Sequence, residues 1–175
     1  TNELEGNDVV KLNIKELQPY KEGGFEAGMN PMVAKTSSIK DFTMNFRNVC
    51  GLLKVSVVGD KKITDAILMG IDEEPLSGMC HVNVEDMSVT MADDALTYVY
   101  VYDSEGVQLD PQEPVDFWFV VPPTVFEHGF RVYLGDTEGG HMICYRTVRT
   151  EVKRSKVVSM SAITYEPEEE GDGIK

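Results

Sequence analysis

Apolar and polar side chains alternate along much of this 175-residue chain. Residues 10–14, 53–57 and 130–134 each place an apolar side chain at every second position, with mostly polar residues between. Side chains two positions apart share one face of a β-strand. This period of two therefore predicts strands that bury one face in a core and leave the other in water.

Two further segments are apolar or aromatic on both faces, TYVYVY at 97–102 and DFWFVV at 116–121. They suit central strands, or strands that lie beneath a second layer. Short turn signals rich in Gly, Asp and Pro separate the strands, and no segment keeps a helical period for three turns. The predicted fold is all-β, an antiparallel β-sandwich.

The first forty residues differ from the rest in composition. Residues 20–38 are rich in Gly, Ser and polar side chains and predict a long surface connection. The strand before them, at 8–15, belongs either to the same sandwich or to the end of a preceding domain. We divide the chain into an N-terminal strand and linker (1–38), a β-sandwich domain (39–166) and an acidic tail (167–175).

Composition fits a globular domain with an ordinary core, since hydrophobic residues make up 42% of the chain and charged residues 26%. The net charge of −14 disfavours binding to nucleic acid or to anionic lipid headgroups. The longest apolar runs, such as WFVV, are far shorter than the ~20 residues of a membrane-spanning helix. We expect no nucleic-acid partner and no membrane-spanning segment.

Candidate metal ligands are widely spaced along the chain: Cys50, Cys80, Cys144, His81, His128 and His141. The cysteines share no CxxC or CxxH spacing, so a metal site is not predicted. The sequence favours buried free thiols and leaves a Cys50–Cys80 disulfide as the alternative. The histidines have no neighbour at ligand spacing, and we interpret them as surface or structural residues.

Carboxylates cluster at residues 72–74 and 93–94, both within turn signals. We interpret them as solvated turn acids. A weak calcium site is the alternative, although the DxDxDG pattern does not occur. No GxSxG, P-loop, GxGxxG or HExxH motif is present, and the glycine-rich GDTEGG at 135–140 predicts a hairpin turn. The prediction is a non-catalytic protein with no cofactor.

Aromatic residues offer the main alternative to a purely structural reading. Tyr98, Tyr100 and Tyr102 alternate along one predicted strand, and residues 117–119 are all aromatic. Core packing is the favoured role, with an aromatic platform for sugars as the alternative. If its neighbours on both sides face the core, Trp118 faces the other way, which makes it the single candidate for ligand contact.

Four segments carry a resemblance to a known family: LQPYKEGGFEAGMNPMVAK at 17–35, FRNVCGLLKVSVVGDKKITDAILMGIDEEPLSG at 46–78, FWFVVPPTVFEHGFRVYLGDTEGG at 117–140 and RSKVVSMSAITYEP at 154–167. In this order they resemble the fimbrillin-like surface lipoproteins of Bacteroides and relatives. The resemblance spans most of the chain, and its motifs are structural. It implies β-sandwich domains of transthyretin-like or Ig-like topology.

The resemblance also implies a place on the cell surface. Such proteins are exported to the outer membrane or fimbrium and held by a lipidated cysteine near the N-terminus. The present chain would correspond to the C-terminal portion, so its membrane contact would be a lipid anchor outside this chain. Its partners would be other fimbrial subunits or surface ligands.

The family reading gives roles to the end of the chain. Pro122 and Pro123 lack N–H donors and should end a strand, and the next strand, FRVYL, should begin after Gly129. Residues 156–165 would form a terminal strand with Val158, Met160 and Ala162 facing inward. Exchange of this strand between protomers would complete a neighbouring sheet. The expected assembly strand comprises Val157, Val158, Met160, Ala162 and Ile163.

Two functions remain open from the sequence. The first is a structural or adhesive surface protein, a fimbrillin-like subunit or adhesin. The alternative is a surface module that binds carbohydrate or another ligand through exposed aromatic residues.

Overall fold

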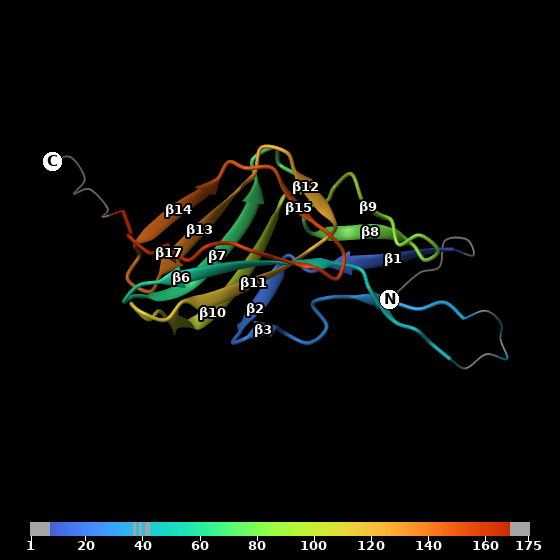
Figure 1. The fold of residues 1–175 in the computed structure, drawn as a ribbon, viewed down its shortest axis with the longest axis horizontal. Coiled ribbons are helices and arrows are strands. Elements are labelled where there is room, and N and C mark those ends of the chain that lie inside the picture. The colour runs from blue at the N-terminus through green and yellow to red at the C-terminus, as the bar shows by residue number, and fades with distance from the viewer. Residues whose placement is uncertain (1–7, 37, 39, 41–42, 169–175) are drawn as a thin grey trace.

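The computed structural model describes residues 8–36, 38, 40 and 43–168, and within them the chain forms strands and no helix (Figure 1). The predicted all-β class is confirmed. No helix long and apolar enough to span a bilayer occurs in this part of the chain. Of the expected acidic tail, residues 169–175 lie outside the described residues.

The largest sheet has six strands. Their order across the sheet is β14 (His141–Arg146), β13 (Phe130–Asp136), β7 (Lys62–Gly70), β10 (Tyr98–Gln108), β2 (Leu17–Lys21) and β3 (Gly24–Phe25). β10 lies inside this sheet between β7 and β2, as the two-sided apolar pattern of residues 97–102 predicts.

A smaller sheet packs against the first and completes a β-sandwich. It contains β11 (Val115–Val121), β6 (Gly51–Val58) and β16 (Val157–Ser159), and β17 (Ile163–Thr164) pairs with a later part of β6. In Figure 1, β6 and β11 cross in front of the six-stranded sheet.

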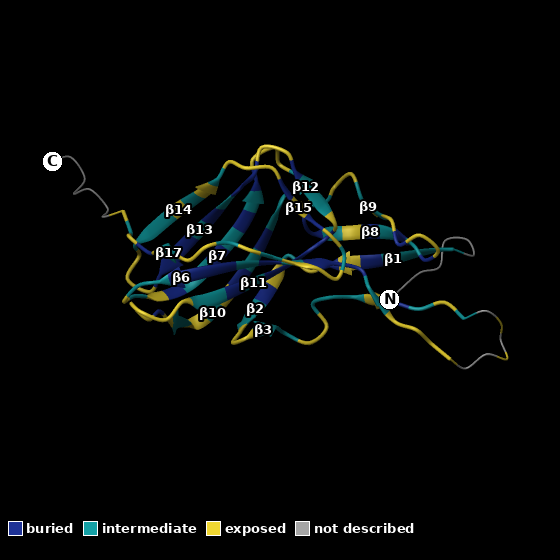
Figure 2. Cartoon of the chain, in the orientation of Figure 1, coloured by how far each residue is buried: buried dark blue, intermediate teal, exposed yellow. Residues whose placement is uncertain are grey.

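The main core fills the space between these two sheets. β6 contributes Leu53, Val55 and Val57, all with no exposed surface, and β13 contributes Phe130 and other residues of its inner face. Figure 2 shows the buried residues as dark stretches along the central strands. The alternation in the sequence therefore predicted the inner faces of these strands correctly.

A second, smaller core lies beside the sandwich. Here β1 (Val9–Ile14), β8 (Gly78–Asn83) and β9 (Val89–Met91) form a three-stranded sheet, and β4 (Met32–Val33) pairs with β5 (Arg47–Asn48). The members of this cluster include Leu12, Ile14, Val33, Val49, Cys50, Cys80 and Val82.

The N-terminal segment is tied to the rest of the chain by strand pairing. β1 pairs antiparallel with β8, and β2 pairs parallel with β10. Residues 20–38, expected as a long surface connection, contain β3, β4 and the end of β2. Period-two patterning did not reveal these strands because each is only two to five residues long.

Between β11 and β14, strands end and begin where the prolines and glycines of the sequence predict. Pro122 and Pro123 come directly after β11, and the short strand β12 (Thr124–Phe126) then pairs with β15 (Thr150–Val152). Gly129 adopts a positive φ of 91° immediately before β13. β13 and β14 form an antiparallel hairpin around the glycine-rich turn, as predicted.

Most strand pairs of the predicted β-sandwich are antiparallel, and three are parallel. The pairs β2–β10, β16–β6 and β17–β6 are parallel. Alternation of apolar residues determines which face of a strand is buried. It does not determine the direction of the neighbouring strand.

Candidate binding face

The outer surface of the six-stranded sheet gathers five of the seven tyrosines of the chain. The strand registers arrange its outward positions in three rows, which run from β14 toward β2 as Tyr145, Arg131, Met69 and Tyr98; then Ile143, Tyr133, Ile67, Tyr100 and Leu17; then His141, Gly135, Asp65, Tyr102 and Pro19. We call these positions the tyrosine face.

The alternation of each strand explains this gathering. Val99 and Val101 of β10 are buried in the core, so Tyr98, Tyr100 and Tyr102 point to the opposite side. On β13 the same rule places Arg131 and Tyr133 outward, because the residues between and beside them belong to the core.

Hydrogen bonds hold the middle of the tyrosine face in place. The phenol of Tyr100 donates to Oδ1 of Asp65, and the hydroxyl of Thr64 donates to Oδ2 of the same carboxylate over 2.5 Å. The hydrogen bond to Asp65, together with burial and the charge of Asp65, raises the pKa of Tyr100 to about 12. Tyr100 therefore keeps its proton and its orientation at neutral pH.

Tyr133 belongs to the middle row of the face. Its ring stacks on His141, with ring centroids 5.8 Å apart and planes 20° apart. Gly135 makes room for it, because a Cβ there would lie 3.2 Å from the Tyr133 ring and 3.3 Å from Oδ2 of Asp65. A side chain at position 135 would crowd the ring and the carboxylate that holds Tyr100.

The face is open to solvent at both margins. Tyr145 on edge strand β14 is 58% exposed, and Leu17 on β2 is 48% exposed. Tyr98, Tyr100 and Tyr133 are half-buried by their neighbours, and Tyr102 is 38% exposed. Surfaces that gather aromatic and aliphatic side chains in this way are candidates for contact sites.

Formal charges on the face cancel. Arg131 and Asp65 are the charged members of the three rows, whereas the whole chain carries −14. The guanidinium of Arg131 donates to Sδ of Met69 over 3.8 Å, and its buried Nε has no hydrogen-bond partner among the described residues. The face is therefore a neutral patch on an acidic protein.

Trp118, the candidate for ligand contact, lies on the other sheet. Phe117 and Phe119 are buried and Trp118 is half-buried, so it faces away from the core as the alternation predicts. The ammonium of Lys54 lies 5.7 Å from the ring centroid. The indole N–H is buried and makes no hydrogen bond among the described residues. Because β11 belongs to the smaller sheet, Trp118 is not part of the tyrosine face.

The proposed assembly strand is paired inside its own chain. β16 and β17 lie parallel along β6, where Val158 pairs with Leu53 and Ile163 with Val57. The side chains of Val158, Met160 and Ile163 pack against the main core. This internal pairing counts against a freely exchanging strand.

One residue expected to face inward on that strand departs from the expected pattern. Ala162 was expected to face inward but is exposed, because β16 ends at Ser159 and the chain is irregular until β17 begins at Ile163. Val157 is 50% exposed at the start of β16.

The structure shows where the candidate metal ligands and their neighbours lie. In the described part of the chain, no group of three His, Cys, Asp or Glu side chains could hold a metal ion. His128 is an exposed turn residue whose Nδ1 lies 2.7 Å from Oδ2 of Asp72. Cys50 and Cys80 are both buried in the second core and form no disulfide.

One turn acid is not solvated, which corrects the interpretation of residues 72–74. Asp72 and Glu73 are exposed, but both carboxylate oxygens of Glu74 are buried without a hydrogen-bond partner among the described residues. The side chain lies over Gly70, where a Cβ would collide with its carboxylate. A glycine at the end of β7 thus accepts the folded-back side chain.

The sequence pointed to only part of the tyrosine face. Tyr98, Tyr100 and Tyr102 stand out as an alternating run, whereas Tyr133 and Tyr145 join them through the pairing of β7, β13 and β14. The hairpin signal at 135–140 could have placed Tyr133 beside β14. No local signal indicates that β13 lies next to β7.

Comparison with known proteins gives a weak structural likeness. No protein-family model matches the chain, and no curated protein matches it. The chain is similar to a crystal structure, at 2.18 Å resolution, of a candidate cell adhesion protein from Bacteroides ovatus ATCC 8483. The sequences are 11% identical, the TM-score is 0.49, and the match covers 93% of this chain but only 65% of that one.

Proposed function

We propose that this chain is a structural or adhesive protein of the cell surface, which acts by contact and not by catalysis. The observation that carries the proposal is the tyrosine face, an open and formally neutral surface on an otherwise acidic β-sandwich. Its exposed margins, Tyr145 and Leu17, offer aromatic and aliphatic contact area without any reactive group.

The finer form of the proposal is a fimbrillin-like subunit or adhesin. The sequence segments at 46–78, 117–140 and 154–167 support it, together with the β-sandwich that they form. In this form the protein would stand on the outer membrane through a lipid anchor outside this chain, and its partners would be other fimbrial subunits. Internal pairing of β16 and β17 favours an adhesin over a subunit that donates this strand.

The second candidate function is a surface module that binds carbohydrate or another ligand. The flat stacking of Tyr133 on His141 and the fixed phenol of Tyr100 favour it, because rigid aromatic groups suit ligand recognition. Both functions require display outside the cell, so the first experiment concerns location.

Immunogold electron microscopy tests the display. An antibody raised against this chain is applied to intact cells that produce the full-length protein. Gold particles along filaments are expected for a fimbrial subunit, and a diffuse outer coat for an adhesin or a binding module. Antibody pre-absorbed with the purified chain is the control. Label that appears only after the cells are permeabilised would overturn the proposal.

A further inference from the structure

We infer that the tyrosine face binds a neutral polysaccharide, whose sugar rings lie on the tyrosine rings. The inference rests on the proposed function for its surface setting and goes further by assigning the site and the class of ligand. It excludes polyanionic polymers and a second protein chain as the main occupant.

The size of the face favours an extended small ligand over a protein. The middle row runs across β14, β13, β7, β10 and β2, which at about 4.8 Å per strand gives a width of roughly 19 Å. Three rows on alternate residues cover roughly 14 Å along the strands. The resulting area of roughly 270 Å² is about one third of the ~800 Å² that each partner buries in a stable protein interface.

The shape of the face suits rings that stack. Tyr98, Tyr100 and Tyr102 repeat along β10 at about 7 Å intervals, because residues two apart share a face. Tyr133 lies two strands away from Tyr100, at roughly 10 Å. Its ring stacks on His141 and lies close to Gly135. A sugar presents a nearly flat C–H face to such a ring, and the aromatic quadrupole attracts those hydrogens.

The chemistry of the face suits hydroxyl-bearing ligands. Five phenols, one carboxylate and one guanidinium surround the stacking surfaces, and these groups hydrogen-bond with sugar hydroxyls.

Charge argues against an anionic polymer. The face itself is formally neutral, since Arg131 and Asp65 cancel, and the rest of the chain contributes the net charge of −14. An acidic polysaccharide would approach an overall repulsive surface without a cationic cluster to receive it. A neutral polymer meets no such barrier.

Affinity electrophoresis tests the inference with defined probes. The purified chain is run in native gels that contain laminarin, amylopectin, galactomannan, xyloglucan or hydroxyethyl cellulose, and in gels that contain alginate or polygalacturonate. Retardation by at least one neutral polymer and by neither anionic polymer is expected. Retardation by none of the neutral polymers, or only by the anionic ones, would overturn the inference.

Substitutions locate the site. Tyr102→Ala and Tyr145→Ala remove exposed rings at the margins, and Tyr133→Ala removes the central ring. Each should weaken binding about tenfold or more, while the matching Phe variants should keep most of it because the ring remains. Thermal unfolding of every variant shows whether it is folded, and the exposed margin residues keep the test usable if Tyr133→Ala is not.

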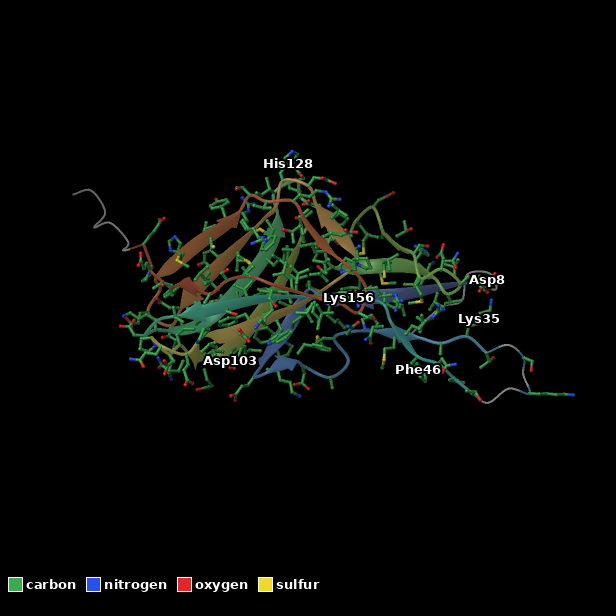
Figure 3. The ribbon with its side chains drawn as sticks, viewed as in Figure 1. Asp8, Lys35, Phe46, Asp103, His128 and Lys156 are labelled. Carbon is green, nitrogen blue, oxygen red and sulfur yellow. The ribbon has the colours of Figure 1, made fainter. Side chains whose placement is uncertain are left out.

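Two control substitutions remove aromatic rings elsewhere. Phe46 directly precedes β5 and lies far from the sandwich strands in Figure 3, and Trp118 lies on the other sheet. The controls are Phe46→Ala and Trp118→Ala. Both should bind as strongly as the unmodified chain. If Trp118→Ala abolishes retardation and the tyrosine variants do not, the site is on the other sheet and the inference is wrong.

Oligomer measurements test whether a second copy of the chain occupies the tyrosine face. Sedimentation of the unmodified chain should give a monomer with its face free. A dimer that dissociates in Tyr145→Ala would show that the face is covered by another copy, and would overturn the inference. Gold label on intact cells without gel retardation would reject the polysaccharide as the ligand and leave the surface function standing. Gel retardation without surface label would support the polysaccharide site and reject the surface function.

Discussion

The side chain of Gln18 takes the place of a missing strand neighbour for Val120. Its Nε2 donates to the carbonyl oxygen of Val120 over 2.9 Å, and its Oε1 accepts from the Val120 N–H over 3.0 Å. A third bond joins Nε2 to the carbonyl of Lys15 over 3.0 Å. Only 1% of Gln18 is exposed, so this amide joins β2 of one sheet to β11 of the other inside the protein.

Replacing Gln18 with alanine should lower the free energy of unfolding by about 2–3 kcal/mol, because the buried N–H and C=O of Val120 lose their partners. Urea denaturation measures the change. Gln112→Ala, at an exposed turn position, is the matched control and should stay within about 0.5 kcal/mol. Equal stabilities for the two variants would contradict the pairing of Gln18 with Val120.

Alanine substitutions at two glycines with positive φ should distinguish the cost of a steric clash from the cost of backbone strain. Gly129 and Gly139 have φ of 91° and 89°, but a Cβ at Gly129 would overlap the carbonyl oxygen of Arg146, whereas one at Gly139 meets nothing within 4 Å. Gly139→Ala should cost about 1 kcal/mol from strain alone. Gly129→Ala should cost about 3 kcal/mol or more, because the start of β13 must also move. Similar losses in urea denaturation would show that the turn adapts without cost.

The ion pair between His128 and Asp72 predicts a defined response to pH. The hydrogen bond and charge of Asp72 raise the pKa of His128 above its ordinary value, although the imidazole is exposed. A raised pKa in the folded state means that the pair stabilises the protein at low pH and loses this effect as pH rises through the folded pKa. NMR titration of the His128 ring should show the raised pKa.

Asp72→Asn should return the pKa of His128 toward its ordinary value, because it removes both the hydrogen-bonded carboxylate and its charge. Asp93→Asn, at an exposed turn away from the pair, is the matched control and should leave the titration of His128 unchanged. An unaltered pKa in Asp72→Asn would show that the pair does not form in solution.

The cysteines should differ in their reaction with iodoacetamide. Burial raises the pKa of the Cys80 thiol to about 11 and raises that of Cys50 as well, while Cys144 is only partly buried. Because the thiolate reacts and needs access, Cys144 should be modified first and the other two only after unfolding. Peptide mass spectrometry identifies the sites. A pair of cysteines that stays unmodified in denaturant until a reductant is added would establish the Cys50–Cys80 disulfide instead.

Much of the fold could be predicted from local pattern, and the missing parts share a physical cause. Alternation identified the buried face of Leu53–Val57 and the outward turn of Trp118, because neighbouring side chains on a strand point to opposite sides. The pairing of β13 with β7 joins residues about sixty positions apart, and nothing local encodes that choice. The tyrosine face depends on this pairing, so the sequence showed only the three tyrosines of β10.

The role of Gln18 was also beyond prediction, for a different reason. A single glutamine in a strand carries no periodic signal, and its amide is as suited to water as to a buried carbonyl. The Gln18 amide bonds to the Val120 backbone and not to water because β11 packs close to β2 in the folded chain. The exposed Ala162 has a similar explanation, because the break between β16 and β17 interrupts an alternation that continues in the sequence.

The parallel pairing of β16 with β6 has a consequence for how the protein is made. Strand β6 is synthesised before both of its neighbours, because β11 and β16 lie much later in the chain. Until then a long apolar strand has two unsatisfied edges, which favours wrong pairing with other nascent chains. A nascent chain that contains β6 but not yet β11 and β16 should therefore be prone to wrong pairing.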